Sequence, residues 1–175
     1  MSYIDIKKTT AADLPALHAI ARQTFYESFA HQNTPEDMQR YLEENLSMQK
    51  LTREWNHPDS VFYLAQFDQE TIGYLKINYG QAQTEIVSNQ SVEIERIYVS
   101  SGFQGRKVGQ LLFETAMDAA RQLKADYLWL GVWEHNTKAI QFYKRNGFVE
   151  FGKHPFRLGE DIQTDLLMRI RINNV

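Results

Sequence analysis

A strand, a glycine-rich turn and a helix start follow one another between residues 94 and 112, and this stretch constrains the fold most. Ile94, Ile97 and Val99 supply β-branched residues at strand spacing. Three glycines punctuate the turn that follows: Gly102, Gly105 and Gly109. Apolar residues then recur with a helical period, at Val108, Leu111, Leu112, Ala116, Ala119, Ala120 and Leu123. The stretch therefore predicts a strand that feeds directly into a helix.

The same turn is suited to bind an anion. A strand that enters a helix through glycines leaves several backbone N–H groups pointing out of the helix N-terminus, where the helix dipole favours negative charge. Arg106 and Lys107 add positive charge at this end. A pyrophosphate would fit such a site, but an ordinary strand–helix joint with solvated basic residues accounts for the pattern equally well.

Helices and strands interleave along the rest of the chain. Helix starts are indicated by the capping-box spacing of residues 10–13, by Thr34-Pro35 with acids after it, and by Ser47. Strands are expected at residues 3–6, 61–67, 72–77, 94–99, 127–133, 148–151 and 165–172. Residues 80–90 are polar and are expected to form an exposed connection. The predicted class is α/β, also describable as α+β, with about seven strands and about four helices.

The composition fits one globular domain. The 175 residues are 43% hydrophobic and no linker divides them, so a single domain over residues 1–175 is expected. The formal net charge of -3 offers no basic face for nucleic acid. No run approaches ~18 apolar residues, and residues 1–8 have no apolar signal core. A cytoplasmic protein without a membrane partner is therefore expected.

A metal site is not expected. The chain has no cysteine, which excludes thiolate ligands and disulfides. His31, His57, His135 and His154 lack ligand-like spacing with acids, so surface or loop roles are expected for them.

A second motif lies between Trp133 and Phe148. Its pattern, Asn-x-x-Ala-x-x-Phe-Tyr-x-x-x-Gly-Phe, is formed by Asn136, Ala139, Phe142, Tyr143, Gly147 and Phe148. The earlier turn, Gln104-Gly105-Arg106-Lys107-Val108-Gly109, is similar to a pyrophosphate loop of the form Gln/Arg-x-x-Gly-x-Gly/Ala. Together the two motifs resemble the GCN5-related N-acetyltransferase (GNAT) superfamily, over about residues 6–170. The resemblance implies the GNAT fold, a mixed, mostly antiparallel sheet flanked by helices.

One residue departs from the family pattern. Lys107 stands where the family usually has a glycine. Its side chain restricts the loop and could crowd the phosphates, or it could contribute an extra cation. The anion site survives either way, because its donors are backbone groups.

The resemblance implies an enzyme that transfers the acetyl group of acetyl-CoA to an amine. The pantetheine arm of this cosubstrate would pair with the backbone of Ile97, Tyr98 and Val99 like an added strand. The pyrophosphate would be held by Gln104, Gly105, Arg106, Lys107, Val108, Gly109 and Gln110. Asn136 would bond the pantetheine, and the cosubstrate would be flanked by Ala139, Phe142, Tyr143 and Lys144 or Arg145.

Tyr143 matches the usual general acid of the family. Its phenol, with a reference pKa of about 10, is protonated at neutral pH and could donate to a departing thiolate. The alternative is a core aromatic residue beside Phe142.

Two glutamates are candidates for the general base. Glu93 and Glu95 are two apart on one strand and so share a face, with Arg96 expected on the other. Glu95 is the first candidate, acting directly or through water, and it could equally bind the substrate cation. A solvated strand face is the alternative.

Shorter segments resemble the bacterial spermidine/spermine N-acetyltransferases of the PaiA type, at residues 24–29, 32–38, 94–99, 130–134 and 163–165. This resemblance implies a small-molecule amine acceptor, a polyamine. A homodimer is a possible assembly, which the sequence does not determine. Glu27, Glu85 and Glu134 would favour a polycation if they border the acceptor cleft. Two alternatives stay open: acetylation of a protein N-terminus or of another amine such as an aminoglycoside, and a non-catalytic acetyl-CoA-binding module.

Overall fold

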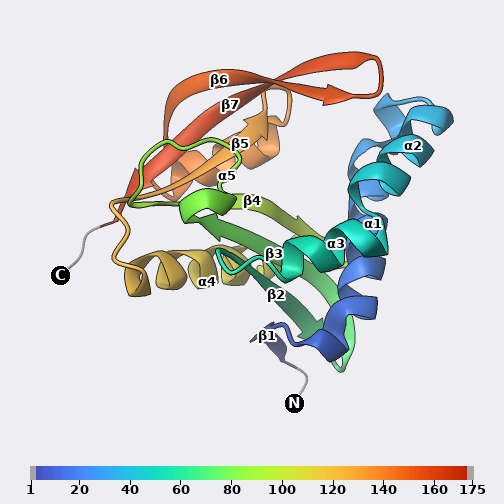
Figure 1. Ribbon diagram of the computed structural model, residues 1–175, viewed down its shortest axis with the longest axis horizontal. Helices are drawn as coiled ribbons and strands as arrows, with labels where there is room; N and C mark the ends of the chain where they lie inside the picture. The colour runs from blue at the N-terminus through green and yellow to red at the C-terminus, as the bar shows by residue number, and fades with distance from the viewer. Residues whose placement is uncertain (1–2, 173–175) are drawn as a thin grey trace.

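A computed structural model describes residues 3–172, and its centre is a single seven-stranded sheet (Figure 1). The strands lie in the order β1-β2-β3-β4-β5-β7-β6. Their bounds are β1 (Ile4–Lys8), β2 (Ser60–Phe67), β3 (Glu70–Tyr79), β4 (Ser91–Val99), β5 (Tyr127–Trp133), β6 (Val149–Leu158) and β7 (Asp161–Arg171). The β4–β5 pair is parallel and the other neighbouring pairs are antiparallel. The predicted α/β class and mixed, mostly antiparallel sheet are confirmed.

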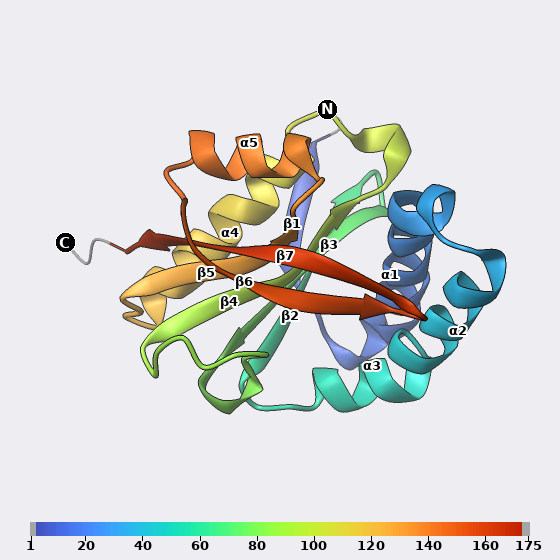
Figure 2. The same cartoon turned by 90° about the horizontal axis from the view of Figure 1, so that it is seen from above.

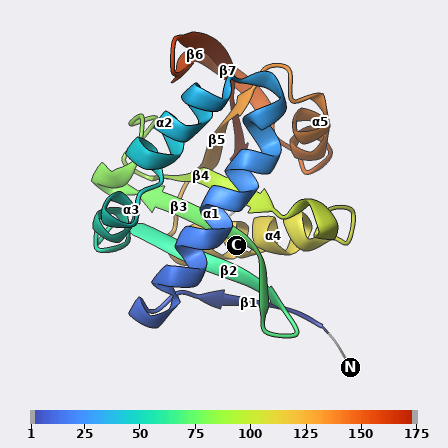
Figure 3. The ribbon, with the colours of Figure 1, turned by 90° about the vertical axis from the view of Figure 1, so that its right-hand side faces the viewer.

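Within residues 3–172, five α-helices cover the two faces of the sheet, where the sequence predicted about four (Figure 2). They are α1 (Leu14–Phe29), α2 (Pro35–Asn45), α3 (Met48–Trp55), α4 (Val108–Gln122) and α5 (Thr137–Arg145). Helix α1 runs across the strands on one face, and its buried residues form a core cluster with those of α2, α3 and the inner strands (Figure 3). Helices α4 and α5 contribute to the second cluster, on the other face.

The helix starts follow the local signals in the sequence. The Thr34 side chain accepts the Asp37 N–H, and Ser47 accepts the Lys50 N–H in the same way. The capping box of Thr10 and Asp13 opens a short 3-10 turn that leads into α1.

Two register features position the site. Strands β4 and β5 pair over Ser91–Ile94 and Tyr127–Leu130 and then part. Strand β4 also carries a bulge, because Lys76 pairs with Arg96 while the next residue of β3, Ile77, pairs with Ile94. The extra residue is Glu95. Its insertion breaks the alternation of side chains. Arg96 therefore pairs with Glu95 itself as well as with Glu54, and the expectation that Arg96 points to the face opposite Glu95 is wrong.

One expected strand boundary and the expected exposure of one residue also differ from the structure. Strand β6 runs on to Leu158, because it pairs with β7 along their common length, well beyond the apolar residues that predicted it. In the polar connection, Gln83 is buried and its Oε1 accepts hydrogen bonds from the Trp129 indole and the Ser91 hydroxyl. The polar side chain of Gln83 therefore accepts hydrogen bonds from buried donors and does not face solvent.

The single-domain prediction extends to residues 1–2 and 173–175, which lie outside the described residues. All seven strands between them belong to one sheet. Within residues 3–172, no helix has both the length and the hydrophobicity needed to cross a membrane.

Candidate active site

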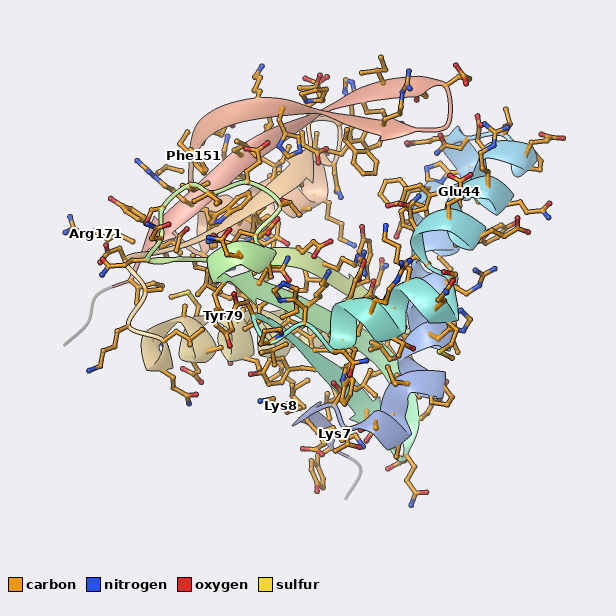
Figure 4. All side chains as sticks on the ribbon, in the orientation of Figure 1. Lys7, Lys8, Glu44, Tyr79, Phe151 and Arg171 are labelled. Atoms are coloured by element: carbon orange, nitrogen blue, oxygen red, sulfur yellow. The ribbon has the colours of Figure 1, made fainter. Side chains whose placement is uncertain are left out.

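A large cavity of about 1670 Å³ opens where β4 and β5 part. Its walls come from β4, the start of α4, β5, α5, the β6–β7 hairpin and the first two helices. Of the three acids considered for an acceptor cleft, Glu27 and Glu85 line this cavity and Glu134 does not. Other acids lie elsewhere: Glu44, labelled in Figure 4, is exposed on α2.

The glycine-rich turn forms one end of this cavity. Lys107 directly precedes α4 in the left-handed conformation, with φ of 64°, and Gly105 has φ of 78°. A glycine adopts this conformation without steric cost, which explains the family preference at the Lys107 position. A Cβ built on Gly105 or Gly109 meets nothing within 4 Å, so the backbone there faces open space. This space and the free N–H groups of the helix start suit a phosphate group.

The basic residues near the turn have different surroundings. Lys107 lines the cavity, whereas the Arg106 guanidinium lies 5.0 Å from the centre of the Phe103 ring. At the end of α5, Arg145 lines the cavity, whereas Lys144 pairs with Glu150 at 3.2 Å.

Helix α5 brings the second motif to the cavity. Asn136 caps the helix, its Oδ1 accepting the Ala139 N–H at 3.2 Å. Tyr143 lines the cavity although it is only 6% exposed, and its ring packs against Phe142 and Phe148. Burial raises the pKa of Tyr143 well above its usual value, so the phenol is protonated at neutral pH. It is thus a core aromatic residue whose protonated phenol belongs to a side chain that lines the cavity.

Glu93 is held by three donors. Its carboxylate accepts the Thr84 N–H at 2.8 Å, the Thr84 hydroxyl, and the Asn78 amide at 3.2 Å. Burial nevertheless raises the pKa of Glu93 above its usual range, and the neighbouring Glu95 charge adds to the rise.

Glu95 lies in a different electrostatic setting on the same wall. Its carboxylate pairs with Lys76, lies 3.4 Å from an Arg96 nitrogen, and accepts the Asn78 amide at 2.6 Å. Burial alone would raise the pKa of Glu95, but the Arg96 and Lys76 charges lower it overall. The two glutamates therefore differ in readiness to take a proton.

Helix α3 contributes a residue that the sequence reasoning missed. Glu54 accepts hydrogen bonds from Lys76 at 3.0 Å and from both terminal nitrogens of Arg96 at 2.8 and 3.2 Å. The ion network thus joins α3 to β3 and β4. No local signal identifies Glu54, because its partners follow it by more than twenty residues.

The β6–β7 hairpin forms the opposite wall. The sequence analysis gave no site role to Asp165 or Gln163, and it expected a surface or loop role for His154, which instead lies in β6 and lines the cavity. Asp165 and Gln163 lie two residues apart on β7 and both line the cavity, as do His154 of β6 and Glu85. His154 Nε2 lies 3.7 Å from Asp165, and Nδ1 contacts Glu85 without the alignment of a hydrogen bond. Burial raises the pKa of Asp165, and His154 opposes the rise.

Aromatic side chains line the cavity between α1, α2 and the hairpin. Tyr41 stacks on Phe25 with ring centres 4.2 Å apart, and the Phe156 ring lies 6.3 Å from Tyr41. Such a wall suits the aliphatic segments of a substrate. No group of three or more His, Asp or Glu side chains within residues 3–172 could hold a metal ion.

Comparison with known proteins agrees with this geometry. The profile of the Acetyltransferase (GNAT) family matches residues 14–148. An uncharacterized N-acetyltransferase in the pepI 3′ region of Lactobacillus delbrueckii subsp. lactis is 43% identical over 97% of this chain and 98% of that protein. The spermidine N(1)-acetyltransferase of Thermoplasma acidophilum is 26% identical over 83% of this chain and 88% of that protein.

A solved structure shows the same fold. The PaiA N-acetyltransferase from Thermoplasma acidophilum, in complex with coenzyme A, has a TM-score of 0.76 at 22% identity, covering 97% of this chain and 99% of that one. The family match spans both motifs and most of the sheet. The chain therefore belongs to the GNAT family and is an acetyl-CoA-dependent N-acetyltransferase.

Proposed function

We propose that this enzyme acetylates a polyamine such as spermidine or spermine. The observation that carries the proposal is the acidity of the cavity on its hairpin side, where Glu85 and Asp165 line the space that Tyr143 also lines, with Glu93 and Glu95 on the β4 wall. Carboxylates in a partly buried cleft attract a polycation and penalise a neutral chain. The spermidine N(1)-acetyltransferase relative and the PaiA-like segments support the same acceptor class.

The open turn and the gap between β4 and β5 fit the acetyl donor. The acetyl carbon would form a bond to the amine nitrogen as its bond to the cosubstrate sulfur breaks, and the departing thiolate would take up one proton to become the free thiol. Gln104 to Gln110 would receive its pyrophosphate, and the backbone of Ile97, Tyr98 and Val99 its pantetheine arm. Asn136 has its Oδ1 committed to the Ala139 N–H, so its amide nitrogen is the group that would bond the arm. Ala139, Phe142 and Arg145 would flank it.

Tyr143 would provide the proton for the leaving sulfur. The phenol is protonated at neutral pH and lines the cavity. A positioned general acid of this kind lowers the barrier for release of a thiol.

Glu93 and Glu95 would have different roles toward the amine. The amine must lose a proton before its nitrogen attacks the acetyl carbon. Glu93, whose pKa is raised, is suited to take that proton through water, whereas Glu95, whose pKa is lowered, is suited to remain charged. The homodimer and the cytoplasmic location expected from the sequence stay predictions.

The direct test is a panel of amines with acetyl-CoA, in which release of the free thiol is measured. Spermidine and spermine should give a higher kcat/KM than alkylamines of similar length, a peptide N-terminus or an aminoglycoside. Equal efficiency with a simple alkylamine would contradict the polyamine assignment and leave the acetyltransferase activity intact. Acetyl-CoA binding without transfer to any amine would instead indicate a non-catalytic module.

A further inference from the structure

The β4 wall and the hairpin wall of the cavity differ in how many of their side-chain oxygens already accept hydrogen bonds from the protein. On β4, Glu93 accepts from Thr84 and Asn78, and Glu95 is bound by Lys76, Asn78 and Arg96. Neutral donors occupy the oxygens of Glu93, and the charge of Glu95 is offset by Lys76 and Arg96. These carboxylates therefore have little capacity left for a cation from outside.

The hairpin wall has the opposite character. Within residues 3–172, the Asp165 carboxylate has His154 as its charged neighbour, at 3.7 Å, which is beyond hydrogen-bond distance. Gln163 is 92% buried, since it is only 8% exposed, and its Oε1 has no hydrogen-bond partner among these residues. Its Nε2 donates to Asp161 at 2.8 Å, so the amide orientation is defined. Two oxygen acceptors on one face of β7 thus lack donors.

An unpartnered acceptor in a buried place has a free-energy cost that a donor from a ligand removes. An alkylammonium group carries up to three N–H donors and one positive charge, which matches a carboxylate and an amide oxygen side by side. Burial also raises the pKa of Asp165, as expected for a carboxylate that lacks a close cation.

The hairpin site also lies next to the gap in the sheet. A Cβ built on Gly131 would lie 3.4 Å from Asp165 Oδ2 and 3.7 Å from the His154 ring. Gly131 directly follows Leu130, the last residue of β5 that pairs with β4. The absence of a side chain at this position leaves the Asp165 carboxylate accessible from the point where the strands part.

We propose that Asp165 and Gln163, with Glu85 beside them, form an ammonium-binding site that receives a charged nitrogen of the acceptor other than the reacting one. The inference rests on the proposed function and makes it more specific. It identifies the acceptor as an amine with at least two nitrogens, one neutral for attack and one charged on the hairpin. Gln163 and Asp165 are substrate-binding residues in this account.

The test compares spermidine with butylamine in Asp165→Asn, an isosteric change that removes the charge. Glu160→Gln is the matched control, because it removes the same charge from the exposed turn of the same hairpin outside the cavity. The ratio of kcat/KM for spermidine to that for butylamine should fall about tenfold or more in Asp165→Asn. The fall should come from the spermidine KM, and the acetyl-CoA KM should stay unchanged.

Gln163→Met removes the unpartnered amide oxygen and keeps the side-chain length, so it should also lower the ratio of kcat/KM for spermidine to that for butylamine. This variant tests the site if Asp165→Asn fails to fold. An equal ratio in wild type and both variants, or an equal loss in Glu160→Gln, overturns the inference while spermidine acetylation continues. If no amine is acetylated, the proposed function fails separately, and calorimetric titration of spermidine tests the site. Affinity lost in Asp165→Asn but kept in Glu160→Gln supports it, and equal affinity overturns it.

Discussion

Tyr143 combines burial with a hydroxyl that has no hydrogen-bond partner within residues 3–172. A buried phenol usually finds such a partner, so its freedom here is consistent with a partner that arrives with the substrates. Tyr143→Phe keeps the ring that packs on Phe142 and Phe148 and removes only the proton. We expect kcat to fall by ~10²–10⁴-fold with acetyl-CoA affinity and melting temperature unchanged.

The control for this change is Tyr63→Phe, which removes the hydroxyl of a half-buried tyrosine outside the cavity. It should leave turnover unaffected. Steady-state kinetics with thiol detection provides the measurement. Turnover of Tyr143→Phe within about twofold of the parent would exclude the acid role.

The two glutamates of β4 should respond differently to loss of charge. A base acts when deprotonated, so activity is lost as pH falls through its pKa, and for Glu93 that fall should occur above the usual range of a glutamate. Glu93→Gln should therefore lower kcat and remove this acidic limb. Glu95→Gln should keep the limb, because the Arg96 and Lys76 charges lower the pKa of Glu95 below that range. Profiles of kcat against pH for both variants provide the measurement. Loss of the acidic limb only in Glu95→Gln would make Glu95, rather than Glu93, the base.

At the level of elements, the start of α4 is the expected anion site. Gly109→Glu should add a side chain and a negative charge where the backbone faces open space, and acetyl-CoA affinity should fall. Gly102→Glu is a matched control, because Gly102 also has open space around its Cβ position but does not line the cavity. Calorimetry on both variants gives the comparison. Equal affinities would place the pyrophosphate elsewhere.

Elements defined by neighbouring residues could be predicted from the sequence. Thr34 and Ser47 cap helices within three residues of themselves, and β5 is a run of apolar residues flanked by turns, so both kinds of signal are local. The extent of β6 could not be predicted, because its outer half is defined by pairing with β7 rather than by its own hydrophobicity.

The residues of the site likewise differ in whether neighbouring residues identify them. The turn before α4 and Tyr143 belong to contiguous motifs, and the sequence predicts them. The bulge at Glu95 depends on the register between β3 and β4, and the partners of Glu54 come from two other elements. Asp165 and Gln163 lie in a segment whose resemblance was visible but whose role depends on which wall of the cavity β7 forms. Contacts between distant parts of the chain leave no periodic signal.

For the molecule as a whole, Glu54 joins the helices of one face to the centre of the sheet. Its partners Lys76 and Arg96 are 5% and 13% exposed, so Glu54→Gln would leave two buried cations with Glu95 as their shared anion. Loss of one partner from a buried pair costs about 3 kcal/mol. Asp118→Asn, which breaks an exposed pair with Arg121, should cost less than ~1 kcal/mol. Urea denaturation measures both, and similar losses would contradict a structural role for the network.

The short parallel pairing of β4 with β5 joins the two halves of the sheet, because β1–β4 and β5–β7 share no other strand pairing within residues 3–172. A ligand along the parted strands would bridge these halves, and at 100 times its Kd it should add about 2.7 kcal/mol to the free energy of unfolding. A melting temperature that stays constant as acetyl-CoA is added would contradict this.

Because acetyl-CoA bound beside the four-residue β4–β5 pairing would stabilise the fold, the resistance of the enzyme to proteolysis should depend on the acetyl-CoA concentration. Proteases act on the unfolded fraction, and that fraction shrinks as the bound fraction grows. The cellular lifetime of the protein should therefore lengthen when acetyl-CoA is abundant and shorten when it is scarce.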